Sequence, residues 1–85
     1  MDRPSFAATQ ERVLRIVERV APNHNVDVER DLRDLGLESM VLMSIAFRIE
    51  KEFDVDLSTL GAELAEQRSV LQLATFLQRV LSERA

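Results

Sequence analysis

The chain has 85 residues, of which 46% are apolar, and a formal net charge of −4. This length predicts a single domain over residues 1–85 with a thin core. Helix packing alone must stabilise that domain, because no disulfide can form. Because the sequence has no cysteine, disulfides, thiolate metal sites and a cysteine nucleophile are excluded.

Charge is distributed unevenly along the sequence. Residues 26–66 carry eleven acids and four bases, whereas the two flanking segments have a small positive balance. This acidic centre disfavours nucleic-acid binding, because a duplex is polyanionic. A basic partner protein would suit it, and a purely solubilising surface is the alternative. The sequence has neither a run of about 18 apolar residues nor a secretory signal, so we expect a cytoplasmic protein that does not enter a membrane.

The first predicted element is an amphipathic helix that ends near Ala21, just before Pro22. Pro4 suits its first turn, and Asp2 or Ser5 could cap it. At helical spacing, one apolar face is shared by Phe6, Val13, Val17 and Val20. We therefore expect this face to lie in the core.

A long connection follows over residues 22–38. Asparagines and Gly36 interrupt its helical periodicity, yet it contains the apolar residues Val26, Val28, Leu32, Leu35 and Leu37. We expect such a loop to pack back onto the core, and loops of this length are often functional. It also holds His24, the single histidine of the chain, which we interpret as a solvated loop residue rather than a catalytic base.

The second predicted helix covers residues 39–53 and has two apolar stripes. The first stripe suits the core and consists of Leu42, Ile45, Ala46, Ile49 and Phe53. The second stripe lies roughly 130° around the helix and consists of Met40, Met43 and Phe47. Two interpretations stay open: the long connection covers the second stripe, or the stripe is exposed and docks partner proteins, a use that suits methionine.

The helical pattern breaks after residue 53, and Ser58 or Thr59 could cap a short third helix that ends near Ala65. Ser69 and Gln72 form a capping-box pattern that opens a fourth helix. Its apolar stripe consists of Val70, Leu73, Leu77, Val80 and Leu81. These elements predict an all-α fold, a four-helix bundle with a long first loop and a short third helix.

Ser39 stands at the start of the second predicted helix, where serine is a common N-cap. The same position tolerates a phosphate, because free N–H groups and the positive end of the helix dipole face it. From the chemistry of this residue alone, capping is favoured over modification.

Residues 34–40, Asp-Leu-Gly-Leu-Glu-Ser-Met, resemble the phosphopantetheine attachment motif of acyl and peptidyl carrier proteins. Residues within 45–57 resemble the second helix of that family and its exit, and residues within 69–77 resemble the start of its fourth helix. The resemblance covers nearly the whole chain and includes the four-helix layout. It therefore favours Ser39 as a modified residue, a role that does not compete with capping.

The resemblance implies a phosphopantetheine-dependent carrier. A phosphopantetheinyl transferase would move 4'-phosphopantetheine from coenzyme A to the Ser39 hydroxyl, and the thiol of this arm would carry acyl or aminoacyl groups as thioesters. The chain would be a non-catalytic monomer without a metal site. It would serve a loading enzyme for acyl or aminoacyl groups, and a ketosynthase, a condensation enzyme or other transfer and tailoring enzymes. By position, the family's partner contacts fall on Leu37, Glu38, Met40, Met43 and Phe47.

The sequence departs from the family's usual pattern at several positions. Glu38 stands where the family commonly has Asp, and Met40 where it commonly has Leu. Val41 and Ser44 stand where fatty-acid carriers usually bear acids, so this helix is more similar to carriers of polyketide or nonribosomal peptide biosynthesis. We interpret the chain as a discrete carrier of such a pathway. The alternatives are a domain excised from a larger synthase, a fatty-acid-type carrier, and an unmodified helical interaction module in which Ser39 is only a cap.

Overall fold

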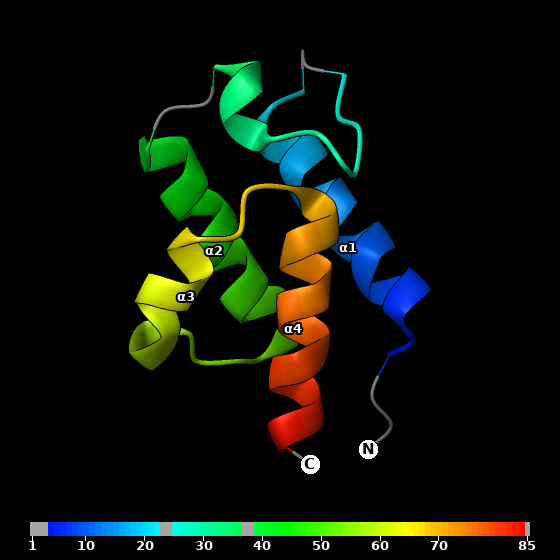
Figure 1. The fold of residues 1–85 in the computed structure, drawn as a ribbon, viewed down its shortest axis with the longest axis vertical. Coiled ribbons are helices and arrows are strands. Elements are labelled where there is room, and N and C mark those ends of the chain that lie inside the picture. Colours follow the sequence, from blue (N-terminus) through cyan, green and yellow to red (C-terminus); the bar gives the residue numbers. More distant parts are fainter. Residues whose placement is uncertain (1–3, 23–24, 37–38, 85) are drawn as a thin grey trace.

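The computed structural model describes residues 4–22, 25–36 and 39–84. In this part of the chain every regular element is helical: α1 (Phe6–Val20), η1 (Leu32–Leu35), α2 (Ser39–Phe53), η2 (Ser58–Leu60), α3 (Gly61–Ala65) and α4 (Val70–Arg84), the η elements being 3₁₀ helices. The predicted all-α fold, with a long first connection and a short third helix, is confirmed (Figure 1).

The three long helices form the body of the molecule. α4 packs along α1, and α2 packs against α1 on another side (Figure 1). The connection from α1 to α2 crosses the end of the bundle at which α1 ends and α2 begins, and η1 lies within this crossing (Figure 1). α2 is therefore held by its contacts with the core on one side and by this connection at its first residue.

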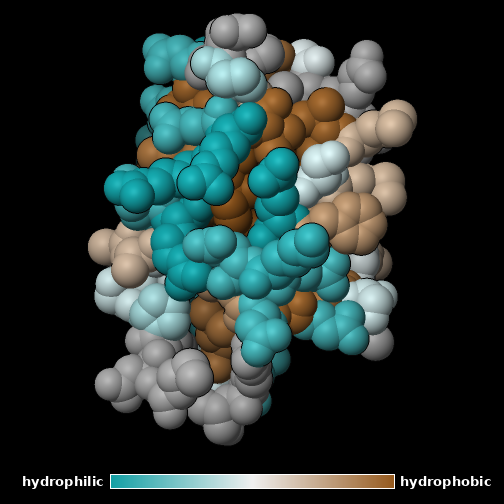
Figure 2. All heavy atoms as spheres, turned by 180° about the vertical axis from the view of Figure 1, so that it is seen from behind, coloured by the Kyte–Doolittle hydropathy of each residue, from teal (hydrophilic) through white to brown (hydrophobic). Residues whose placement is uncertain are grey.

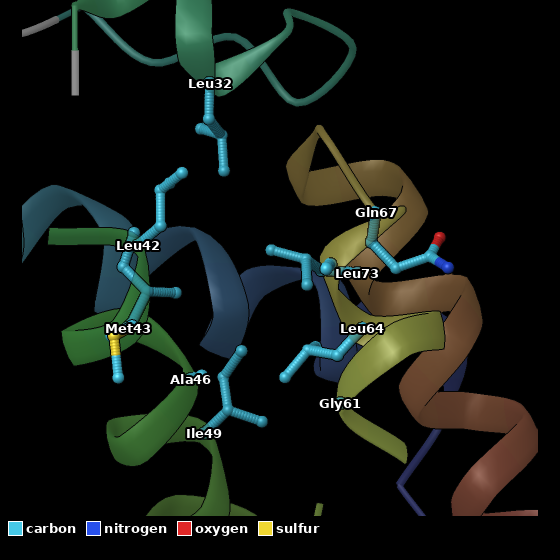
Figure 3. Close-up of a pocket in the computed structure, with 11 residues that line it drawn as sticks. Leu32, Leu42, Met43, Ala46, Ile49, Gly61, Leu64, Gln67 and Leu73 are labelled. Carbon is cyan, nitrogen blue, oxygen red and sulfur yellow. The ribbon is translucent and has the colours of Figure 1, made fainter. Parts of the chain in front are cut away.

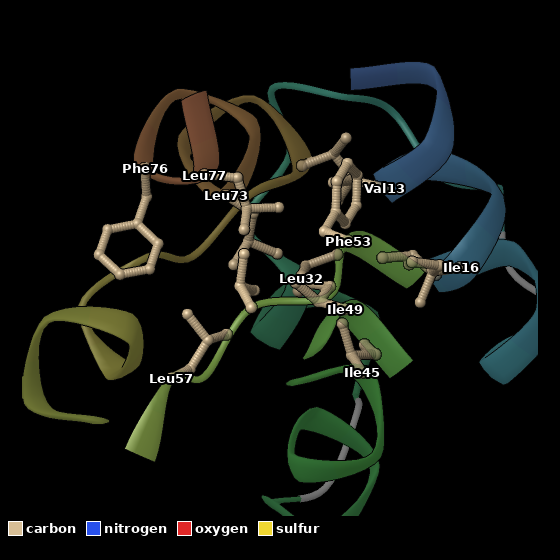
Figure 4. Packing of buried hydrophobic residues seen from close by; sticks show 13 residues of the cluster. Val13, Ile16, Leu32, Ile45, Ile49, Phe53, Leu57, Leu73, Phe76 and Leu77 are labelled. Carbon is tan, nitrogen blue, oxygen red and sulfur yellow. The ribbon is translucent and has the colours of Figure 1, made fainter. Parts of the chain in front are cut away.

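The core forms where the apolar stripes of the long helices meet (Figure 4). Its buried members are Val13, Ile16 and Val17 of α1, Ile45, Ile49 and Phe53 of α2, Val70, Leu73, Phe76 and Leu77 of α4, and Leu32, Val55 and Leu57 of the connections. Each long helix has 15 residues. Isolated helices of that length are marginal in water, so this shared burial is what stabilises them.

One predicted core position of α1 was wrong. Phe6 is 39% exposed, because it is the first residue of the helix and lies at the end of the bundle. Thr9 is fully buried instead. Its hydroxyl donates to Gln78 Oε1 of α4 at 2.8 Å, and Gln78 Nε2 donates to the Pro4 carbonyl at 2.8 Å. The buried hydroxyl is thus satisfied, which is the condition for a polar group in a core.

The ends of α1 are capped largely as predicted. The Ser5 hydroxyl accepts the Ala8 N–H at 3.1 Å and is the N-cap, whereas Asp2 lies outside the described residues. Pro4 precedes this cap, so its predicted place in the first turn was wrong. At the other end the Ala21 N–H donates to the Val17 carbonyl at 2.9 Å, as expected for a helix that ends before proline.

The capping box of α4 is present in a shifted form. The Ser69 hydroxyl accepts the Gln72 N–H at 3.1 Å, as predicted. Gln72 Oε1 accepts the Arg68 N–H at 2.7 Å, one residue earlier than in the standard box. Ser69 is therefore the N-cap, and the chain is fixed as it enters α4.

Ser58, one of the two predicted caps of the third helix, does not cap it. Ser58 lies inside η2, where the carboxylate of Asp56 accepts its N–H at 2.9 Å. The residues that precede η2 and α3, Leu57 and Leu60, make no side-chain capping bond. The side chain of Thr59, the other predicted cap, lies outside the described part of the chain. Asp56, two residues before Ser58, stabilises this turn instead by accepting the Ser58 N–H.

The long connection packs back onto the start of α4, as predicted. Leu32 is 2% exposed, and its N–H donates to the Arg68 carbonyl at 2.6 Å. The Leu71 N–H donates to the Val28 carbonyl at 2.8 Å, so the connection is bonded to α4 at two points. Val26, Val28 and Leu35 are partly buried against the core. His24 and Leu37 lie outside the described residues.

Candidate functional site

The segment that carries the sequence motif joins η1 to α2. The Asp31 carboxylate caps η1 by accepting the Arg33 N–H at 2.9 Å. Gly36 follows η1 in a left-handed conformation, with φ 75° and ψ 20°, and its N–H donates to the Arg33 carbonyl at 3.0 Å. Glycine adopts this conformation at no steric cost, which gives the motif glycine a structural reason. Glu38, a predicted partner contact, lies outside the described residues, as Leu37 does.

Ser39 is the first residue of α2, the position that the sequence predicted for it. No acidic residue occurs in the first turn of α2, so the positive end of the helix dipole is not neutralised there by a side chain of the helix. A phosphate ester at this residue would face free backbone N–H groups. The backbone position therefore fits a phosphodiester. The Ser39 side chain lies outside the described part, so its capping role stays a prediction.

The second apolar stripe of α2 is exposed. Met40 is 77% exposed, Met43 57% and Phe47 59%, whereas Ile45 and Ile49 on the opposite side of the helix are buried. Figure 2 shows hydrophobic side chains projecting along the edge of the molecule that α2 forms, beside hydrophilic ones. We call Met40, Met43 and Phe47 the α2 strip. The long connection therefore leaves this strip exposed, and the docking of partners on it stays a prediction.

A hollow of about 280 Å³ lies between α2 and α3, next to the α2 strip (Figure 3). Its walls are almost entirely apolar and include Leu42, Met43 and Ala46 of α2 and Leu64 of α3. Met43 belongs both to the α2 strip and to the wall of this hollow. The sequence did not reveal the hollow, because the tilt of a five-residue helix such as α3 leaves no periodic signal.

The charged side chains of α2 fall into two groups. Arg48 and Lys51 are exposed and form no ion pair with any residue that the structure describes. Glu50 accepts the Leu57 N–H at 3.0 Å, and Glu52 forms an ion pair with Arg12 of α1 at 3.3 Å. The carboxylates of α2 therefore hold neighbouring segments, while its cations stay available.

Across the described ranges, no group of three or more His, Cys, Asp or Glu side chains is placed to hold a metal ion. Among the described helices, none combines the length and the apolarity needed to cross a membrane. The fold places Ser39 at the first residue of α2 and an exposed apolar strip along the same helix.

Comparison with known families shows which family the chain belongs to. The profile of the family described as phosphopantetheine attachment site matches residues 11–77, which include the motif and span α2 and most of α4. The chain belongs to this phosphopantetheine-attachment family. No curated protein and no solved structure matches the chain.

Membership of the phosphopantetheine-attachment family has direct consequences. The domain is an attachment site for covalent 4'-phosphopantetheine, and the protein is a phosphopantetheine carrier. Carrier domains of this family are generally non-catalytic and interact with a phosphopantetheinyl transferase and with biosynthetic enzymes. The predicted family and its cofactor are thereby confirmed.

Proposed function

We propose that Ser39 is the attachment residue and that residues 1–85 form a single carrier domain. The observation that carries this proposal is the coincidence of the family match over residues 11–77 with a serine at the first residue of α2. Two features of the backbone support it: the left-handed turn at Gly36 and a first turn of α2 without acidic side chains. When bound, the arm supplies a terminal thiol that holds acyl or aminoacyl groups as thioesters.

The proposed carrier catalyses no step itself. The enzymes that load, transfer and modify the cargo supply the active sites: a loading enzyme, then a ketosynthase, a condensation enzyme or other tailoring enzymes. We propose that these enzymes contact Leu37, Glu38 and the α2 strip. The exposure of Met40, Met43 and Phe47 supports this for the strip, because exposed apolar clusters on small proteins are interaction sites. We further propose that the chain works as a monomer in the cytoplasm, where coenzyme A is available.

We assign the carrier to polyketide or nonribosomal peptide biosynthesis rather than to fatty-acid synthesis. The support lies in the first half of α2, where Val41 is half-buried and the Ser44 hydroxyl donates to the Met40 carbonyl at 3.1 Å. Neither residue offers a carboxylate to a basic partner, unlike the acids that fatty-acid carriers usually bear there. A fatty-acid-type carrier is the alternative.

The decisive experiment incubates the purified chain with coenzyme A and a promiscuous phosphopantetheinyl transferase and records the intact mass. We expect the addition of one phosphopantetheine arm to the wild type and none to Ser39→Ala. Ser44→Ala is the matched control, because it removes another hydroxyl of α2 and should leave the addition intact. An unchanged mass of the wild type across several transferases would overturn the proposal. It would favour an unmodified interaction module that binds partners through the α2 strip.

A further inference from the structure

The exposed face of α2 is basic as well as apolar. Relative to Phe47, Lys51 lies about 40° and Arg48 about 100° around the helix axis, on the side away from α3. Both cations are exposed, and neither forms an ion pair with a described residue. The α2 strip and these two side chains therefore form one continuous surface of hydrophobic and positively charged groups.

The acidic side chains of α2 do not neutralise this surface. Glu50 is half-buried and accepts the Leu57 N–H, which fixes the segment after α2. Glu52 is paired with Arg12, whose Nη2 also donates to the Glu52 carbonyl at 2.8 Å. Both carboxylates are engaged by groups of this chain, so the two cations are the charges of α2 without a described partner.

This local charge is opposite to the charge of the surrounding sequence. Residues 26–66 have an excess of acids, which by itself suggested a basic partner. Nine of those eleven acids lie outside α2, in the connection before it, in the segment after it and on or next to α3. Electrostatic complementarity is decided by the residues at the contact, because exposed charges farther away than about 10 Å are screened by salt.

We propose that the α2 strip, together with Arg48 and Lys51, binds a protein surface whose apolar side chains are flanked by carboxylates. This rests on the proposed function, in which the partners are enzymes that serve the carrier. The strip supplies the apolar contact, and the hollow beside Met43 receives one apolar side chain of the partner. The cations select the partner and fix its orientation along α2. An anionic membrane offers the same chemistry. We favour a protein surface because the partners of the proposed carrier are enzymes, and vesicle binding is an outcome of the experiment.

The experiment uses three synthetic amphipathic helical peptides with one shared apolar face, flanked by Glu, Gln or Lys. Binding to the ¹⁵N-labelled full chain is followed by chemical-shift titration at low and high salt. We expect the Glu peptide to bind tightest, to shift the amides of Met40, Met43 and Phe47, and to weaken as salt is added. The double variant Arg48→Glu/Lys51→Glu should bind it on the order of tenfold more weakly and should prefer the Lys peptide.

The matched control is Arg30→Glu/Arg68→Glu, which makes the same change in net charge at exposed positions outside α2. It should keep the preference for the Glu peptide. Arg48→Gln/Lys51→Gln should lose the preference without reversing it, which keeps the test valid if the reversal disturbs folding. Equal binding of the three peptides, preference for the Lys peptide or binding of none overturns the inference. So does binding to anionic phospholipid vesicles that Phe47→Glu abolishes.

Addition of the phosphopantetheine arm is measured by mass on the same samples. A modified wild type that shows no peptide preference overturns this inference and leaves the proposed function standing. A wild type that no transferase modifies overturns the proposed function itself, whatever the peptides do.

Discussion

Gly36 shows how one residue shapes the approach to α2. Its φ of 75° lies in the left-handed region, where a side chain clashes with its own backbone. A Cβ added to Gly36 would meet no atom within 4 Å, so the constraint is the torsion angle and not the surrounding space. Gly61, the other glycine, also has room for a Cβ but has φ −55°. Substitutions at the two glycines therefore distinguish the cost of backbone strain from the cost of a steric clash.

We predict that Gly36→Ala lowers the free energy of unfolding by about 1 kcal/mol, because alanine resists the left-handed conformation. Gly36→Asn should cost less, since asparagine tolerates that conformation better. Gly61→Ala should instead raise stability by about 0.5 kcal/mol, because it lies in a helix. Urea denaturation followed by circular dichroism measures all three. Similar losses for both alanine variants would contradict the explanation by torsion angle.

At the scale of elements, α2 has two apolar faces with different roles. Ile49 is fully buried, whereas Phe47, two residues earlier, is 59% exposed. Two residues correspond to about 200° around a helix, so the two side chains point in nearly opposite directions. One face of α2 stabilises the bundle, and the other is available to partners.

We predict that Phe47→Glu leaves helicity intact and changes the free energy of unfolding by no more than about 0.5 kcal/mol, because the side chain is mostly outside the core. The kcat/KM of the transferase for the variant should fall on the order of tenfold, through loss of an apolar contact. Ile49→Ala is the contrasting variant and should cost about 2–5 kcal/mol of stability. Unfolding of Phe47→Glu would show that the strip belongs to the core. Unchanged kinetics would remove it from the transferase interface.

For the whole molecule, two carboxylates that accept backbone N–H groups predict a dependence of stability on pH. Hydrogen bonds from the Arg33 side chain and N–H hold the pKa of Asp31 below its ordinary value. Hydrogen bonds from Ser58 likewise lower the pKa of Asp56. A carboxyl whose pKa is depressed by folding stabilises the folded state above its unfolded pKa, and this contribution is lost as pH falls through the folded pKa.

We therefore predict that the denaturation midpoint falls as the pH is lowered from about 5 to about 3, the range around and below the ordinary aspartate pKa. Asp31→Asn/Asp56→Asn should show a smaller fall, because the amides do not titrate. Asp27→Asn makes the same chemical change at another exposed aspartate and serves as the control. An equal fall in the double variant and the wild type would assign the pH dependence to other carboxyls.

Much of the local structure followed from the sequence. The period of apolar residues located the long helices, and the side chains of Ser5 and Ser69 cap the helices that they were expected to cap. Two predictions failed because the local sequence pattern did not show the tertiary position of a residue or which of two neighbouring polar side chains makes a hydrogen bond. Phe6 has the correct period but lies at the bundle end, and Asp56 performs the turn that was assigned to Ser58. A local sequence pattern does not show how far a residue lies from the rest of the fold.

The sequence by itself determined the helical class, the attachment motif of residues 34–40 and a second helix with two apolar stripes. It could not decide whether the long connection covers the second stripe of α2, because the apolar residues of the connection do not show by themselves where they pack. Only the tertiary structure decided this. Backbone hydrogen bonds from Leu32 to Arg68 and from Leu71 to Val28 hold the connection against the start of α4. The described apolar side chains of the connection are buried or partly buried against the core, and the α2 strip is left exposed on the helix that begins at Ser39.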